Sequence, residues 1–244
     1  MKPMIQVQQV SQVFGTRTIF KDVSFDIMPG EVFVVLGGSG CGKSTLMNQM
    51  IGLLPPTSGD ILIAGHSVTR ERDEIRRQIG VMFQSGALFG SMTLQDNVSL
   101  ALNVFTDLPR AACDEIARIK LGLVGLADAA ARLPSEISGG MVKRAAIARA
   151  LALDPPVVML DEPSAGLDPI TSAGLDKLIL SLRDTLGMTC VVITHELSSI
   201  MAIADRCAML DGKAQGLIGL GSPQALKQDT SNPTIRAFFN RETL

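Results

Sequence analysis

A glycine-rich segment that ends in lysine and serine has the clearest capacity for chemistry in this sequence. It fits the pattern G-x-x-x-x-G-K-S/T and comprises Gly37, Gly38, Ser39, Gly40, Cys41, Gly42, Lys43 and Ser44. The segment follows a predicted strand and opens a predicted helix, which is the context that this phosphate-binding motif requires. Glycines let the backbone wrap phosphate oxygens, and the helix N-terminus directs free N–H groups at the anion. We therefore expect Lys43 to neutralise the β- and γ-phosphates of a nucleotide and the Ser44 hydroxyl to bind Mg²⁺. The alternative is a glycine-rich turn without a ligand, which these flanking elements disfavour.

An acidic pair, Asp161-Glu162, follows the apolar segment 157–160. In proteins with such a phosphate loop this strand lies beside the loop, which would place Asp161 near the metal ion. Glu162, one residue on, would take a proton from the attacking water, a contribution of about 10²- to 10⁴-fold in rate. Without the upstream loop, the pair would instead indicate an acidic strand end that caps a helix.

The elements that must position these groups alternate between strands and helices, which implies a parallel sheet. Residues 31–36 are expected to form a buried parallel strand, because the run 32–36 is continuously apolar. Helical character runs from 94 to 151, with breaks at Pro109, Gly122 and Pro134. The other expected elements are strands within 4–28 and at 60–64, 157–161 and 189–194, helices at 43–51 and 170–186, and short strands with a final helix, 233–239, within 205–244.

We therefore predict an α/β fold with a parallel sheet, an antiparallel β edge and an inserted helical subdomain at about 85–151. All of it would form a single domain spanning residues 1–244.

Composition argues against several other classes. A formal net charge of −2, with acids and bases interspersed, gives no electrostatic footprint for nucleic acid. Tyr and Trp are absent, so stacking platforms for single strands would be scarce. The four cysteines, Cys41, Cys113, Cys190 and Cys207, contain no CxxC pair. A disulfide framework or zinc site is therefore not expected, and reduced thiols suit the cytosol.

The apolar runs in the sequence are short, and none approaches the roughly 20 residues that span a bilayer. Residues 1–10 alternate polar and apolar side chains and lack the apolar stretch of a secretory signal. We expect a soluble chain that stays in the cytoplasm.

The segment Ile137-Ser138-Gly139-Gly140-Met141 resembles the LSGGQ signature of ABC ATPases, and it precedes the acidic pair as in that family. A phosphate loop alone would also fit a kinase or a GTPase, whereas these three motifs in this order are specific. The resemblance covers essentially the whole chain. It implies ATP as the nucleotide, Mg²⁺ as the metal and hydrolysis as the reaction.

The resemblance assigns roles to further residues. Phe14 matches the aromatic residue that stacks on adenine, and Thr45 joins the nucleotide-binding set. Gln84 matches the glutamine that contacts Mg²⁺ and water and senses the membrane partner. Asp168 matches a residue that reaches across the dimer, and His195 matches the histidine that holds the γ-phosphate. Taken singly, Phe14 would be a core residue and Gln84 a loop residue. Asp168 would be a helix cap, and His195 would be a buried histidine at a strand end.

The signature also has a physical logic. Ser138 is a good N-cap for a helix through 143–151, which would expose the Gly139 and Gly140 amides to a phosphate. In ABC ATPases this phosphate belongs to ATP on the opposite subunit, so the resemblance implies a second copy of this chain as a partner. Two ATP molecules would then join two chains head to tail, and hydrolysis would release them.

Two residues of these motifs differ from the common family pattern, and a third is a cysteine. Met141 replaces the usual glutamine of the signature, and Gly38 replaces a common proline of the phosphate loop; neither change removes a catalytic group. Cys41 lies in the loop at a helix N-terminus, where the pKa of a thiol is lowered. We therefore expect alkylation of Cys41 to inhibit the protein and ATP to protect it.

Residues 83–89, Phe-Gln-Ser-Gly-Ala-Leu-Phe, resemble the ATPases of Mla-type (maintenance of lipid asymmetry) transporters and their MCE-associated relatives. Met92, the segment 96–98, the segment 133–141 and the segment 168–171 strengthen this likeness. It implies transport of phospholipids or other lipids through an integral membrane permease. It also implies an MCE-domain protein, in some cases a STAS-domain adaptor, and a peripheral location on the cytoplasmic face of the bacterial inner membrane.

Other members of the same family remain alternatives. Amino-acid importers tend to carry Phe-Pro-His-Met where this chain has Phe89-Gly90-Ser91-Met92, although a generic importer stays compatible with the loop. Soluble ABC ATPases of DNA repair and translation need a coiled-coil insertion or two ATPase domains, which this sequence lacks. A nucleotide-binding module without turnover is disfavoured because Glu162 and His195 are both present.

Overall fold

The computed structural model describes residues 2–242, so Met1 and residues 243–244 of the expected domain lie outside it. The N-terminal part of the chain forms a four-stranded antiparallel sheet with the order β2-β1-β4-β5. Its strands are β1 (Ile5–Phe14), β2 (Arg17–Ile27), β4 (Ser58–Ile63) and β5 (His66–Ser67). The strands expected within 4–28 and at 60–64 are confirmed, and most of the antiparallel pairing belongs to this separate sheet.

The second sheet has six strands in the order β10-β9-β3-β8-β7-β6. These are β3 (Val32–Gly37), β6 (Ile79–Met82), β7 (Val157–Asp161), β8 (Thr189–Ile193), β9 (Arg206–Asp211) and β10 (Gly216–Gly221). Neighbours pair in parallel, except that β10 runs antiparallel to β9 at the edge. The expected buried strand is confirmed as β3, and every residue of it is buried.

The strand that carries the acidic pair does not lie directly beside the phosphate loop, so this part of the expectation is wrong. β8 pairs with β3 on one side and with β7 on the other. The chain leaves β7 through α6 (Pro169–Leu186) and returns as β8, which occupies the place next to β3. The acidic pair is therefore one strand further from the loop than expected.

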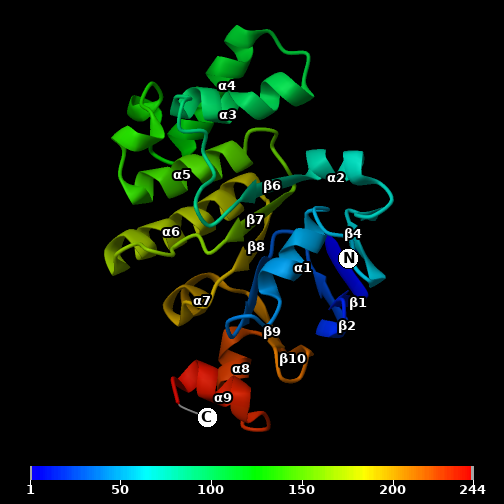
Figure 1. The fold of residues 1–244 in the computed structure, drawn as a ribbon. Helices are drawn as coiled ribbons and strands as arrows, with labels where there is room; N and C mark the ends of the chain where they lie inside the picture. Colours follow the sequence, from blue (N-terminus) through cyan, green and yellow to red (C-terminus); the bar gives the residue numbers. More distant parts are fainter. Residues whose placement is uncertain (1, 243–244) are drawn as a thin grey trace.

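Successive residues of the parallel sheet face two different layers, because side chains alternate along a strand. Phe33 and Val35 pack in a core with α1 (Lys43–Met50) and the antiparallel sheet. Val34 and Leu36 pack in a second core with the helices of the other face. Figure 1 shows α1 on the side of the antiparallel sheet and α6 and α7 (Leu197–Ile203) on the opposite side.

The expected helical region lies at one end of the molecule, drawn in green in Figure 1. It contains α3 (Leu94–Phe105), α4 (Arg110–Leu123) and α5 (Gly139–Ala150). Pro109 is the N-cap residue of α4, the helix ends one residue after Gly122, and Pro134 opens a short 3-10 turn. The breaks read from the sequence therefore separate these helices. α5 also contacts β6, so it connects the helical end to the parallel sheet.

Several short elements had no counterpart in the sequence pattern. These are β5, α2 (Arg72–Gln78), β6, α7 and α8 (Pro223–Gln228). None exceeds seven residues, which is too short for a helical period or a strand alternation to emerge. The final helix is confirmed as α9 (Pro233–Asn240). Among residues 2–242, no helix combines the length and the apolar character needed to cross a membrane.

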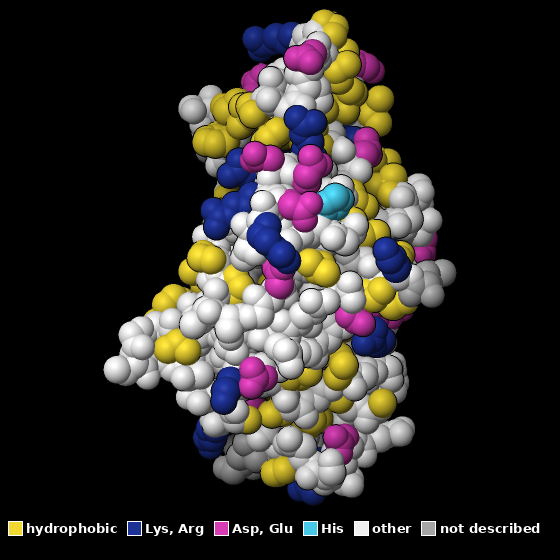
Figure 2. Space-filling model, turned by 90° about the vertical axis from the view of Figure 1, so that its right-hand side faces the viewer, with side chains coloured by type: hydrophobic (Ala, Val, Ile, Leu, Met, Phe, Trp, Pro, Cys, Tyr) yellow, Lys and Arg dark blue, Asp and Glu magenta, His cyan; other side chains and the backbone are white. Residues whose placement is uncertain are grey.

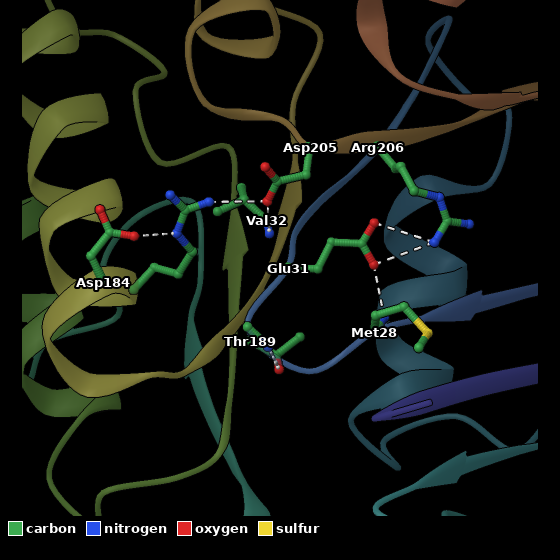
Figure 3. A network of polar contacts seen from close by, with 9 residues as sticks. Met28, Glu31, Val32, Asp184, Thr189, Asp205 and Arg206 are labelled. Carbon is green, nitrogen blue, oxygen red and sulfur yellow. Dashed lines mark hydrogen bonds and ion pairs between the residues drawn. The ribbon is translucent and has the colours of Figure 1, made fainter. Parts of the chain in front are cut away.

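A network of charged side chains holds the beginning of β3, at the opposite end of the strand from the phosphate loop (Figure 3). The Glu31 carboxylate accepts a hydrogen bond from the Met28 amide at 2.7 Å and lies 3.3 Å from Nη1 of Arg206. The Asp205 carboxylate accepts one from the Val32 amide at 2.8 Å. The side chain of Glu31 is only 7% exposed, so its charge depends on these partners because an unpaired buried charge is costly.

We expect Glu31→Ala to lower the free energy of unfolding by about 1–3 kcal/mol, because the Met28 amide and the Arg206 guanidinium lose their acceptor. Urea unfolding at neutral pH, followed by circular dichroism, measures this loss. Glu115→Ala is a matched control, since Glu115 is exposed and lies 3.6 Å from Arg118 on α4. Exposed pairs add little stability. Identical unfolding curves for Glu31→Ala and the unchanged protein would contradict this role of the network.

Candidate nucleotide-binding site

The phosphate loop connects the C-terminal end of β3 to the first residue of α1, as expected. Its two end glycines are tightly packed. A Cβ at Gly37 (φ 148°) would lie 2.2 Å from the carbonyl oxygen of Leu210 on β9, and one at Gly42 (φ 103°) would lie 2.7 Å from the Phe20 ring. Both the contacts and the left-handed backbone therefore restrict these positions to glycine.

The ammonium group of Lys43 folds back on the loop in this structure. Its Nζ donates hydrogen bonds to the carbonyl oxygens of Gly37, at 2.9 Å, and Gly38, at 3.0 Å. The side chains of Ser39 and Ser44 are exposed, as is the backbone of residues 38–40. The loop thus presents a cation, a free hydroxyl and accessible backbone to one patch of solvent, which suits an incoming anion.

Asp161, Glu162 and His195 come together where β7 and β8 end. Nδ1 of His195 lies 2.7 Å from Oε1 of Glu162, and the Glu162 amide donates to the carbonyl of Ile193 at 2.8 Å. Glu162 has a positive φ of 46°, a conformation that costs a non-glycine residue about 1–3 kcal/mol and that persists only where its surroundings hold it. Oε2 of Glu162 is buried and has no hydrogen-bond partner among the described residues. This leaves one acceptor atom available for a ligand or a water.

The electrostatics of Asp161 connect the acidic pair to the loop. Burial raises the pKa of the Asp161 carboxyl, and the neighbouring Glu162 carboxylate adds to the rise. The ammonium groups of Lys43 and Lys143 oppose it. The charge of Lys43 therefore acts on Asp161 although the strands that precede them are not adjacent.

A depression of about 730 Å³ brings Gln84 into the same region. Its lining includes Gln84, Gly139, Lys143 and Asp161. Lys143, on α5, donates hydrogen bonds to the carbonyl oxygens of Gln84 and Glu162. Sequence reasoning missed Lys143. The signal was its place on the buried face of α5, where Ala146, Ile147 and Ala150 recur at helical spacing.

The signature residues form the start of α5. The Ser138 Oγ accepts a hydrogen bond from the Met141 amide at 3.3 Å, so the expected N-cap is confirmed. Gly139 and Gly140 are the first residues of the helix. A Cβ at Gly140 would lie 2.7 Å from Cγ2 of Thr171 on α6, so packing also restricts this position.

Of three further residues expected at the site, Asp168 also has a local structural role. Asp168 is the N-cap residue of α6, and its Oδ1 accepts hydrogen bonds from the amides of Ile170 and Thr171, both at 3.0 Å. Phe14 lies at the end of β1 and is 48% exposed, so it is not the core residue that its type alone would suggest. Thr45, in the first turn of α1, is half-buried.

The expectation that the thiol of Cys41 has a lowered pKa is wrong. Burial raises the pKa of its thiol, and the opposing effect of the Lys43 charge is smaller. The side chain is only 2% exposed. Burial therefore outweighs the helix N-terminus, and Cys41 lines the inner side of the loop rather than its ligand-facing side.

The strand, glycine loop and helix, together with the acidic pair, define a P-loop nucleoside triphosphatase. A model of the ABC transporter family matches residues 20–165, a segment that contains the phosphate loop, the signature and the acidic pair. The chain belongs to the ABC transporter family and is an ATP-binding, ATP-hydrolysing member of it.

Two relatives and one solved structure illustrate the similarity. The chain is 40% identical over 241 residues to the "Intermembrane phospholipid transport system ATP-binding protein MlaF" of Escherichia coli (strain K12), covering 97% of this chain and 88% of MlaF. It is 41% identical over 240 residues to the "Probable ribonucleotide transport ATP-binding protein mkl" of Mycobacterium leprae, covering 97% of this chain and 68% of that protein. A dimeric structure of the ATP-binding cassette MJ0796, in a post-hydrolysis state with ADP and Pi, matches with a TM-score of 0.80 and 29% identity, over 90% of this chain and 98% of that chain.

The position of Cys41 predicts slow alkylation of the folded protein. Because the pKa of its thiol is raised, the reactive thiolate is a smaller fraction at neutral pH than for an exposed cysteine, and burial blocks access. Mass spectrometry after a short iodoacetamide pulse should find the peptide with Cys41 largely unmodified in the folded protein and modified after unfolding in urea. Rapid labelling of Cys41 in the folded protein, suppressed by ATP, would instead show that this thiol is reactive and that ATP protects it.

Proposed function

We propose that this chain is the ATP-hydrolysing subunit of a lipid transporter and that it works as two copies around two ATP molecules. The observation that carries the proposal is the pairing of His195 with Glu162, whose second carboxylate oxygen is buried without a partner among residues 2–242. This group lies within electrostatic reach of the phosphate loop through Asp161. A carboxylate held in this way is suited to orient and deprotonate a water next to a phosphate.

ATP would be held by the loop and by Phe14. The backbone of residues 37–42 and the amides of Lys43, Ser44 and Thr45 would surround the phosphates, and the Lys43 ammonium would exchange its two carbonyl contacts for phosphate oxygens. Phe14, exposed at the end of β1, would stack on the adenine ring.

The chemistry of the donor groups suits Mg²⁺. Ser44, Gln84 and Asp161 supply a hydroxyl, an amide and a carboxylate oxygen, and oxygen donors are what this ion prefers. Gln84 and Asp161 line the same depression. When bound, the ion would neutralise the charge of the phosphates. It would also reduce the repulsion between Asp161 and Glu162 that contributes to the raised pKa of Asp161.

The second copy would complete each site. The N-terminus of α5, with Ser138, Gly139, Gly140 and Met141, would meet the ATP phosphate held by the other chain. Asp168 would lie at the same interface. Cassettes of similar structure are seen as dimers, including the MJ0796 cassette. Head-to-tail pairing would give two complete sites from two incomplete ones.

The helical region, about 85–151, is the part that we assign to the permease. A cavity of about 350 Å³ lies between α3, α5 and β6 and is lined by Phe89, Val104 and Phe105 among others. Figure 2 shows hydrophobic side chains gathered at the end of the molecule that carries α3 and α4. Phe89, Val104 and Leu108 are all exposed there. An apolar hollow beside the Gln84 loop would let the docked permease influence the hydrolytic site.

The lipid assignment is supported by the segment 83–98 and by the similarity to MlaF, whose name states intermembrane phospholipid transport. The name of the mkl protein states ribonucleotide transport instead, and an amino-acid importer is the other alternative. We favour lipid because Phe83–Phe89 and Asp96–Val98 carry the Mla-type pattern in the loop that would face the permease. An MCE-domain protein, a STAS-domain adaptor and the cytoplasmic face of a bacterial inner membrane belong to the same proposal.

Glu162→Gln should keep ATP binding but lower turnover by about 10²- to 10⁴-fold, because the amide cannot accept the proton. The ATP that is not hydrolysed should then hold two chains together. Phosphate release and gel filtration with ATP and Mg²⁺ measure both effects, and a purely monomeric Glu162→Gln protein with ATP would count against the sandwich dimer.

Lys43→Ala is the control for that experiment. Loss of a charge-assisted contact to phosphate should weaken nucleotide affinity by roughly 10- to 100-fold, so the Lys43→Ala, Glu162→Gln protein should stay monomeric at ATP concentrations that dimerise Glu162→Gln alone. An unchanged affinity of the Lys43→Ala protein for ATP would show that Lys43 does not bind the phosphates.

The assembled transporter tests the substrate. Reconstituted with its permease, it should move labelled phospholipid between vesicles in an ATP-dependent manner and should not move labelled amino acids or ribonucleotides. Phe89→Asp should reduce this transport at least about tenfold through loss of apolar contact with the permease, since burying an unpaired charge is costly. Leu220→Asp, an exposed apolar position on β10, should transport normally. Transport of amino acids or ribonucleotides alone would refute the lipid assignment.

A further inference from the structure

Lys143 is a buried cation that the proposed mechanism does not use. It lies in the first half of α5, and its side chain is only 7% exposed. Lysine is among the residues that are least often fully buried unless paired. Burial lowers the pKa of its ammonium group, while the carboxylates of Glu162, Asp161 and Glu196 oppose that shift. Because burial of the Lys143 ammonium group is costly, the group needs specific hydrogen-bond acceptors around it.

The partners of Lys143 come from two separate loops. Its Nζ donates to the carbonyl oxygen of Gln84, which follows β6, and to the carbonyl oxygen of Glu162, at 3.3 Å, which follows β7. An ammonium group is compact and carries three donors, so one lysine can join two backbone segments in this way. Both segments carry a side chain that we assign to hydrolysis.

The hydrogen bond from Lys143 to the Glu162 carbonyl supports a residue whose backbone is strained. Its positive φ of 46° needs support from both sides of the peptide. The Glu162 amide donates to the carbonyl oxygen of Ile193, and the Glu162 carbonyl oxygen accepts from the Ala165 amide at 3.2 Å and from Lys143 at 3.3 Å. Removal of the Lys143 contact would leave the carbonyl with the Ala165 amide alone, and this weaker support would let the carboxylate turn away from His195.

Arg149, six residues further along the same helix, holds the other end of the Gln84 loop. Its guanidinium donates to the carbonyl oxygens of Gly86, at 3.1 Å, and Ala87. A Cβ at Gly86 would lie 3.0 Å from Val142, so the loop also packs closely on α5. Residues 84–87 are thus fastened to α5 at two points, and of these two cations only Lys143 also contacts Glu162.

We propose that Lys143 is a positioning residue for ATP hydrolysis: it holds the Gln84 loop and the Glu162 backbone to α5, the helix whose N-terminus would meet the phosphate on the other copy. The inference rests on the proposed function, because it assigns Glu162 to hydrolysis. Its consequence is that a shift of α5 on engaging the partner's ATP is transmitted to the hydrolytic residues of its own chain. Each site would then be arranged for hydrolysis only when the N-terminus of its own α5 contacts the ATP held by the other copy.

The test compares Lys143→Met with Lys143→Arg and with Lys177→Met, which removes an exposed lysine from α6. For Lys143→Met we expect kcat to fall about 10- to 100-fold, the range for a small misplacement of a reacting group, with KM for ATP within about twofold. Lys143→Arg should recover most of the rate, and Lys177→Met should match the unchanged protein. In the Glu162→Gln background, Lys143→Met should still form the ATP-dependent dimer, which shows that the fold and nucleotide binding survive.

The same set of proteins can overturn the inference. An unchanged kcat for Lys143→Met, a parallel loss of ATP affinity, or an equal further loss when Glu162 is already glutamine would each exclude positioning through Glu162. If Lys143→Met does not fold, Lys143→Gln replaces it. Its shorter neutral amide should lower kcat several-fold at constant KM, and a normal kcat would refute the role. Normal turnover by Glu162→Gln itself would instead mean that the proposed function has failed first.

Discussion

The parallel pairing of β8 with β3 on one side and β7 on the other is the constraint on which the rest of the site depends. Parallel strands end at the same edge of a sheet, and the chain crosses this edge at the phosphate loop, at Glu162 and at His195. Backbone segments more than 150 positions apart in the sequence, such as those of Val35 and Ile193, therefore lie side by side. The hydrogen bonds of the Glu31 and Asp205 carboxylates hold the other end of β3, so the strand is fixed at both ends.

Motifs whose meaning is local were predictable from the sequence. The glycine loop, the Ser138 cap and the long helices depend on neighbours within a few residues, and each is found where the pattern indicates. The order of the strands was less accessible, because nothing in the segment 157–161 states which strand it pairs with. The burial of Cys41 was missed for the same reason: Leu210 and Gly212, which approach the loop from far along the chain, exclude water there.

α5 combines three tasks within twelve residues. Its first turn carries the signature, and its buried face is built largely of alanine that allows close approach to the core. Two of its cations, Lys143 and Arg149, hold the Gln84 loop. Lys143 illustrates why side chains that act on backbone carbonyls are hard to find by pattern. Its partners are backbone carbonyl oxygens, which every residue carries, so no sequence motif identifies them.

The packing of Gly37 against Leu210 has a mechanical consequence. With the Leu210 carbonyl oxygen close behind it, Gly37 has no room to move toward the sheet when an anion binds. It can give way only outward, into the space that the ligand itself fills. The start of the loop is therefore held in place before an anion binds, and the rearrangement left for binding is that of the Lys43 side chain.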